Sequence, residues 1–255
     1  MTISVLNIPF ESYETSVPVL LDKLEAGTII AKQVMVMLKP NLVNDSPFPV
    51  TTSPEFCRVV IEYVRAYSDA KIILAEGCGD AHLETNEVFA NLGFDRLARE
   101  MDIELLDLNH ADLQRHTYPG NTIFPEFYLP KIATQSFIIS LPVLKAHSLA
   151  EITGTLKNMM GFAPPQHYSG GGYWKKAAFH DEMQRSIIEL NRYILPNLTL
   201  MDASVGLSQY HLGGPECHPH VNRLIAGFDP YAVDQSAARL LGMDPDRIPH
   251  ICTPD

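Results

Sequence analysis

Residues 135–161, QSFIISLPVLKAHSLAEITGTLKNMMG, contain the stretch that decides the fold. The segment Phe137–Leu141 is a short and nearly continuous apolar run, which is typical of a strand buried on both faces of a parallel sheet. Pro142 then ends regular pairing, because a proline nitrogen has no hydrogen to donate to a neighbouring strand. The sequence therefore predicts a buried strand that stops at this proline.

Polar and cationic side chains follow the predicted strand at once. Lys145 and His147 come just after the proline, and a helix is predicted that carries Lys157 and Asn158. Open α/β sheets bind their ligands at the carboxyl ends of the strands. We therefore expect these four side chains to line a ligand site.

Three further apolar runs repeat the pattern of a buried strand with a polar end. They are Gln33–Leu38, Lys71–Ala75 and Ile103–Leu106. Amphipathic helices are predicted between them, and the clearest begins either with Ser53 as N-cap before Pro54 or with a Thr52–Glu55 capping box. This alternation predicts an α/β fold with a mostly parallel sheet and helices on both faces.

The remaining segments are expected to complete a single α/β domain over residues 1–255. An edge strand is predicted at Ile3–Ile8, a strand at Leu198–Met201 that ends at Asp202, another at Arg223–Ala226, and a last helix capped by Asp229. Residues 110–131 are expected to form a loop, because prolines and a glycine interrupt them.

A small appendage is predicted around residues 160–180. Within it, residues 165–176 contain Gly170-Gly171-Gly172, and three successive glycines leave the backbone little to hold it. We therefore predict a mobile glycine-rich loop there.

Charge and composition exclude several classes of protein. The formal net charge of −11 argues against a nucleic-acid partner. No apolar run approaches the roughly 20 residues that cross a bilayer, and the first residues do not resemble a signal peptide, so no membrane partner is expected. The four cysteines form no C-x-x-C pair, which leaves no zinc ribbon or iron–sulfur motif. Reduced thiols and a cytoplasmic location are the expectation.

Most candidate site residues lie at or just beyond predicted strand ends, and Lys157 and Asn158 lie on the predicted helix that follows. For catalysis we single out His147, Lys145 and Glu76, and for ligand binding Lys39, Asn41, Lys157, Asn158 and Asp202. Each also has an ordinary structural interpretation. Lys39 and Asn41 would then cap local carbonyl groups, Glu76 would be a turn residue, and Lys157 would be a solvated lysine in the middle of a helix.

Cys217, His218 and His220 form a weaker candidate group for a metal ion. Their spacing is non-specific, so we predict no metal ligand among the site residues.

Several motifs, in order along the chain, resemble the family called domain of unknown function 362 (DUF362). They are Lys39-Pro40-Asn41-Leu42, Thr51-Thr52-Ser53-Pro54, Glu76-Gly77, LPVLKAH at 141–147 and TLKNMMG at 155–161, with Asp202 and Gly213-Gly214-Pro215 where the family's DG…GP signature lies. The family has no general assigned reaction. Many members carry cysteine-ligated iron–sulfur clusters on an appended ferredoxin-like segment. This sequence has no such segment, which weakens any redox role that the resemblance implies.

Two functions from different classes fit these observations. In the first, the chain is an enzyme or binder whose lysines hold a small anionic ligand, bearing a phosphate or a carboxylate, at the carboxyl edge of the sheet. Each ion pair at about 4 Å contributes roughly 4 kcal/mol of attraction at an effective dielectric constant near 20. The alternative is a non-catalytic accessory protein for a redox or cofactor-maturation partner. A deep pocket with converging lysines favours the first function, and an exposed apolar patch favours the second.

Overall fold

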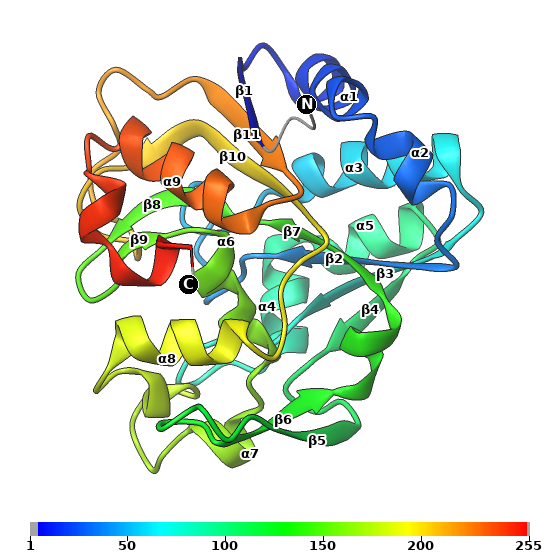
Figure 1. Ribbon diagram of the computed structural model, residues 1–255. Coiled ribbons are helices and arrows are strands. Elements are labelled where there is room, and N and C mark those ends of the chain that lie inside the picture. Colours follow the sequence, from blue (N-terminus) through cyan, green and yellow to red (C-terminus); the bar gives the residue numbers. More distant parts are fainter. Residues whose placement is uncertain (1–4, 254–255) are drawn as a thin grey trace.

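The predicted parallel strands lie side by side in one large sheet (Figure 1), in a computed structural model that describes residues 5–253. The strands run in the order β1-β11-β10-β7-β2-β3-β4. Their bounds are β1 Val5–Pro9, β2 Met35–Pro40, β3 Lys71–Glu76, β4 Glu104–Asp107, β7 Phe137–Leu141, β10 Leu198–Leu207 and β11 Arg223–Gly227. From β10 to β4 all neighbours are parallel, which confirms the predicted sheet, whereas β11 and β1 add antiparallel pairs at one edge.

Helices cover both faces of this sheet. One face carries α1 Tyr13–Lys23, α2 Ala26–Ile30, α3 Pro54–Tyr67, α4 Thr85–Leu92 and α5 Phe94–Glu100, and the other carries α6 Thr155–Asn158, α7 Pro165–Tyr168, α8 Met183–Asn191 and α9 Pro230–Leu240. Neighbouring residues of a strand point to opposite faces, so Val36 and Leu38 pack with the first group and Met37 with the second. Within residues 5–253, none of the helices is both long and apolar enough to cross a membrane.

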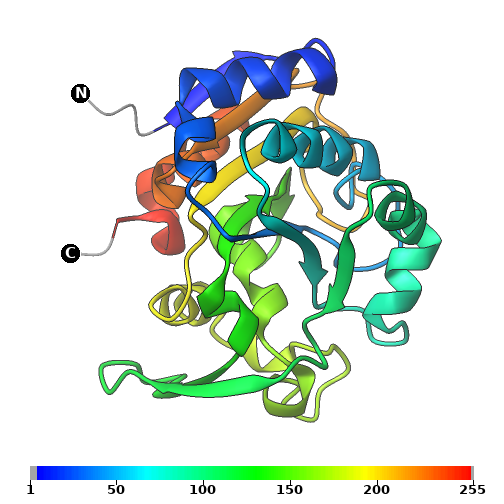
Figure 2. The same ribbon diagram turned by 90° about the vertical axis from the view of Figure 1, so that its right-hand side faces the viewer.

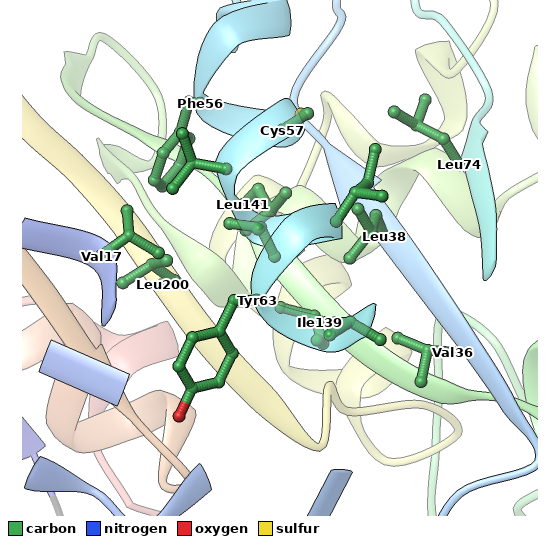
Figure 3. Close-up of a cluster of buried hydrophobic side chains, with 14 of the residues drawn as sticks. Val17, Val36, Leu38, Phe56, Cys57, Tyr63, Leu74, Ile139, Leu141 and Leu200 are labelled. Carbon is green, nitrogen blue, oxygen red and sulfur yellow. The ribbon is translucent and has the colours of Figure 1, made fainter. Parts of the chain in front are cut away.

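Helix α3 shows how the sequence sets one of these layers. Ser53 is its N-cap, and the hydroxyl oxygen accepts a hydrogen bond from the Phe56 N–H at 3.2 Å. The alternative Thr52 capping box is not formed, because the Thr52 hydroxyl donates to the Leu141 carbonyl at 2.7 Å instead. Figure 3 shows the apolar face of α3 over Ile139 and Leu141 of the sheet.

Strand β7 ends before Pro142 as predicted, but the chain does not leave the sheet there, so the expected strand exit at Lys145 and His147 is wrong. Strand β8, Val143–His147, follows at once and pairs with β10 in parallel and with β9, Glu151–Thr153, in antiparallel. Pro142 cannot donate a hydrogen bond, but its carbonyl still accepts one from the Asp202 N–H at 2.9 Å. Lys145 and His147 therefore lie on a buried strand.

The prediction of a loop over residues 110–131 is also wrong. This segment contains a hairpin of β5, Leu113–Thr117, and β6, Glu126–Pro130. Its prolines lie in the connection and at the end of β6, where they interrupt no pairing. Figure 2 shows the hairpin, in green, at the end of the molecule opposite α1.

The segment around residues 160–180 packs on the second face of the sheet. Tyr168 of α7 is buried and stacks on Phe127 with ring centroids 4.3 Å apart, and Lys176 is buried as well. Residues 170–174 between them are exposed. The glycine-rich loop is predicted to be mobile. Because Tyr168 and Lys176 are buried, this stays a prediction for the exposed residues 170–174 alone.

Candidate functional site

The ends of β2 and β3 meet in a buried ion pair. Lys39 Nζ lies 2.7 Å from a carboxylate oxygen of Glu76, and neither side chain is more than 3% exposed. Lys39 also donates to the Pro40 carbonyl at 2.8 Å and to Asn158 Oδ1 at 3.2 Å. All three ammonium hydrogens therefore have acceptors within the protein.

The Glu76 carboxylate is equally well paired. It accepts from the Leu42 N–H at 3.1 Å and from the Gly77 N–H at 2.8 Å. Gly161 lies directly against it, because a Cβ atom at that position would be 2.1 Å from Glu76 Oε1 and 2.7 Å from Lys39 Nζ. The glycine thus allows the backbone to cover the ion pair, which joins β2, β3 and the segment after α6.

Two asparagines connect this ion pair to a second lysine. Asn41 Nδ2 donates to Asn158 Oδ1 at 3.3 Å, and Lys145 donates to Asn41 Oδ1 and to the Val50 carbonyl. Lys145 is fully buried on β8, and burial, reinforced by the charge of Lys157, lowers its pKa to about 7. Four of the predicted residues, Lys39, Asn158, Asn41 and Lys145, are thus joined by hydrogen bonds.

Lys157 differs from the other lysines of the site. Helix α6 holds it against the cleft, and within residues 5–253 its ammonium makes no hydrogen bond or ion pair. Burial lowers its pKa to about 8. Lys157 is only half-buried, so its ammonium faces the cleft and keeps contact with solvent there.

His147 is held as a neutral ring. Its Nδ1 accepts hydrogen bonds from the N–H groups of Leu149 at 3.0 Å and Ala150 at 3.1 Å, so the ring proton resides on Nε2. Burial, with the nearby charge of Lys157, lowers the pKa of His147 far below its usual range. His147 thus offers an N–H donor, and its Nδ1 is not free to act as a base.

Two residues that the sequence analysis missed complete the site. Lys176 is 4% exposed and donates to Asn109 Oδ1 at 2.6 Å and to the Ala163 carbonyl, and burial lowers its pKa to about 7. The His211 ring stacks on His147 with centroids 3.9 Å apart. Both lie outside regular strands and helices, and no spacing in the sequence marks them.

Apart from Lys39, which lies behind the lining, these site residues line one cleft with two adjoining hollows. The first has a volume of about 70 Å³ and is lined by Asn41, Glu76, Lys145 and Thr153 among others. The second has a volume of about 230 Å³ and is lined by His147, Trp174, His180 and Tyr210 among others. Lys157, Lys176 and His211 belong to both hollows. Three lysines and a single carboxylate thus line the cleft of a chain whose net charge is −11.

Three polar groups of the first hollow lack a partner within the described part of the chain. Besides the Lys157 ammonium, they are the Thr153 hydroxyl and His211 Nδ1, which are both out of contact with solvent. Buried polar atoms are nearly always hydrogen-bonded in folded proteins, and unpaired ones require a reason. Their gathering in one hollow indicates a position where an external group completes the hydrogen bonds.

Asp202 does not line the cleft. Its carboxylate accepts hydrogen bonds from the hydroxyl groups of Tyr13 and Ser204, and burial raises its pKa. This contact joins β10 to α1. The geometry gives Asp202 a structural position, away from the predicted ligand.

The structure does not assemble Cys217, His218 and His220 into a metal site. His220 is paired with Glu216 at 2.9 Å. Among residues 5–253, one group of three possible ligands is close together, namely Glu84, Asp107 and His110, with ligand atoms within 4.8 Å of one another. The Lys175 ammonium already lies 3.1 Å from Glu84, which opposes a cation there.

Comparison with known proteins identifies the family. The profile of the family "Domain of unknown function (DUF362)" matches residues 36–239, which include every cleft residue named above. The chain belongs to this family.

No curated protein matches the sequence. Among solved structures, the DUF362 chain is similar to the lactate racemase apoprotein from Thermoanaerobacterium thermosaccharolyticum, with a TM-score of 0.56 and 14% identity. The likeness covers 93% of this chain and 57% of that chain, so the DUF362 chain spans little more than half of the racemase, and at this identity it shows the fold alone.

Proposed function

We propose that the cleft binds a small organic anion that bears a phosphate or a carboxylate group, and that the protein acts on this ligand as an enzyme or carries it as a binder. The observation that carries the proposal is the set of unpartnered polar groups in the first hollow, the Lys157 ammonium, the Thr153 hydroxyl and His211 Nδ1. A phosphate or carboxylate oxygen accepts from an ammonium and from a hydroxyl, and a protonated phosphate or an N–H tautomer of the ring satisfies the histidine.

The charges around the cleft favour an anion over a cation. Lys145, Lys157 and Lys176 face it, and Glu76, the one carboxylate in the lining, is engaged by Lys39. In a partly desolvated site each cation attracts an anion more strongly than in bulk water. Met160, which lines both hollows, offers an apolar wall for the carbon part of a small ligand.

The accessory function is the weaker alternative. Exposed apolar side chains do occur here, and they include Leu149, Trp174 and Tyr210. They line the second hollow instead of a flat face, so we assign them to the enclosure of a ligand. An enzyme would also be compatible with the family and with the fold of the racemase, whose named substrate is a carboxylate.

Lys157→Met provides the test of anion binding. Methionine keeps the length and the apolar stem of the side chain, and Lys157 has no partner within the described residues that would be left unpaired. We expect the folded variant to melt at the same temperature as the wild type or above it, because a desolvated charge has been removed. Phosphate, pyrophosphate, sulfate, malonate and citrate should raise the melting temperature of the wild type and have a much smaller effect on the variant.

Lys32→Met is the matched control, since Lys32 is exposed and precedes β2, whereas the cleft residue Asn41 follows the other end of this strand. It removes the same charge and should keep the full stabilisation by anions. Equal stabilisation of the wild type and of Lys157→Met by every anion would contradict the proposal. No stabilisation of the wild type by any of them would contradict it as well.

A further inference from the structure

We propose that Lys157 is a nucleophile that forms an imine with the carbonyl group of an anionic aldehyde or ketone held in the cleft. This inference rests on the proposed function and specifies its substrate class as a carbonyl compound that carries a carboxylate or a phosphate. The three lysines of the cleft lining differ in their hydrogen bonds.

The number of N–H hydrogens that remain after imine formation decides which of these lysines can react without losing a hydrogen bond that the fold needs. A protonated imine keeps one hydrogen on nitrogen, and a neutral imine keeps none. Lys145 donates to Asn41 and to the Val50 carbonyl, and Lys176 donates to Asn109 and to the Ala163 carbonyl. An imine at either lysine would leave a buried acceptor without its donor, which opposes the reaction.

No buried acceptor in the described part of the chain depends on a hydrogen bond from Lys157. Within residues 5–253 its nitrogen makes no hydrogen bond or ion pair, and it borders both hollows of the cleft. Imine formation there breaks no internal contact. Lys145 and Lys176 keep their hydrogen bonds and line the same cleft, so their N–H groups face the anionic end of the same substrate.

The surroundings of Lys157 also favour the uncharged amine that the attack requires. Lysines become nucleophilic when they are desolvated, and burial has this effect on Lys157. The pKa of Lys157 is lowered to about 8 by burial, so a sizeable fraction is neutral near physiological pH. His147, His211 and His250 lie close enough to feel the charge of Lys157, and their lowered pKa values keep all three rings neutral.

The step balances without an oxidant or a reductant. The Lys157 ammonium releases one proton, and the amine attacks the carbonyl carbon and forms the C–N bond of a carbinolamine. The former carbonyl oxygen then leaves as water with two hydrogens, and the C=N bond forms. In sum, an ammonium and a carbonyl give a protonated imine and one water molecule. The Thr153 hydroxyl, which has no partner in the same hollow, is available to the carbinolamine oxygen.

Reductive trapping tests the inference on the full chain. The protein is incubated near pH 8 with pyruvate, a carboxylate with an adjacent ketone, and with cyanoborohydride, which reduces C=N bonds to stable amines. Peptide mass spectrometry then locates the attached group. We expect trapping at Lys157 to be at least about tenfold faster than at the exposed Lys32, because a much larger fraction of Lys157 is unprotonated. Inorganic phosphate should slow the reaction at Lys157 alone.

Acetone and propionate test the carbonyl group and the carboxylate group of the substrate separately. Acetone has the carbonyl without the carboxylate and should label Lys157 slowly, whereas propionate has the carboxylate alone and should raise the melting temperature without labelling. Lys157→Arg keeps the positive charge and should lose the label at this position. Trapping at Lys157 no faster than at Lys32, or preferential trapping at Lys145 or Lys176, would overturn the inference.

Failure of this inference and failure of the proposed function give different results. If phosphate still stabilises the wild type while Lys157 is not trapped, the imine is excluded and anion binding stands. If neither effect occurs, both proposals are wrong. These measurements use the wild-type protein and do not depend on the folding of any variant.

Discussion

Lys39 and Glu76 form an ion pair that is shielded from water by the backbone at Gly161. Removal of one partner leaves an uncompensated buried charge or a buried group without its donor. We expect Lys39→Met and Glu76→Gln each to lower the free energy of unfolding by about 3–5 kcal/mol. The double variant contains neither charge, so its loss should be smaller than the sum of the two single losses. Urea denaturation of the four proteins measures this coupling, and strictly additive losses would show that the pair is not a unit.

At the same scale, the sequence was informative wherever a polar residue followed a buried strand. Lys39, Asn41, Glu76, Lys145 and Asn158 were predicted from strand ends and the motifs around them, and the structure brings them together. Lys176 and His211 were missed. They reach the cleft from irregular segments, whose path depends on tertiary packing that no periodicity reveals.

Among the strands, those made of continuous apolar runs were predictable and the others were not. The buried strands β2, β3 and β7 were predictable, because runs of apolar residues have few alternatives at that length. Strand β8 was not, since Pro142 lacks the N–H of a regular strand, yet the long β10 pairs with β7 before the proline and with β8 after it. In the β5–β6 hairpin, the alternation of buried Phe127 and Leu129 was a usable signal that the surrounding prolines concealed.

Helix α3 offers a test at the scale of one element. Ser53→Ala removes the side-chain oxygen that accepts the Phe56 N–H, while Pro54 at the first position of the helix is kept. The free energy of unfolding should fall by about 1 kcal/mol, as for other N-cap residues. Ser53→Asp, which restores an acceptor and adds favourable charge at the N-terminus, should recover most of the loss. Thermal or chemical unfolding curves of the three proteins measure these differences. A free energy of unfolding that is the same for Ser53→Ala and for the wild type would contradict the role of this cap.

For the whole molecule, the buried lysines predict how binding and stability depend on pH. Burial lowers the pKa of Lys145 and Lys176 to about 7 and that of Lys157 to about 8, from 10.5 for a lysine in water. Between these values and 10.5 the unfolded chain binds more protons than the folded one. These three lysines therefore make the free energy of unfolding rise with pH across that window.

Anion binding should have the opposite dependence. Sulfate keeps its charge throughout this range and prefers the ammonium forms, so its affinity should fall as pH rises from about 6 to about 9, by up to about tenfold per pH unit for each proton taken up on binding. Isothermal titration calorimetry at constant ionic strength measures the affinity and the protons exchanged. Lys157→Met should show a shallower dependence, and an affinity that stays constant or increases with pH would contradict the lysines as the binding groups.

Strand β1 pairs with β11 alone among the described strands, although nearly the whole length of the chain separates Val5 from Gly227. On the ribosome, β1 therefore emerges long before its partner is made. Until Arg223–Gly227 leaves the exit tunnel, the nascent chain carries an unpaired strand and an uncovered edge of β10, which are the features that attract other unpaired strands. The parallel strands β2, β3, β4, β7 and β10 all precede β11 in the chain, so this edge is the last part of the sheet that can close. A circular permutant that encodes β1 after β11 would remove that interval and leave the pairing itself unchanged.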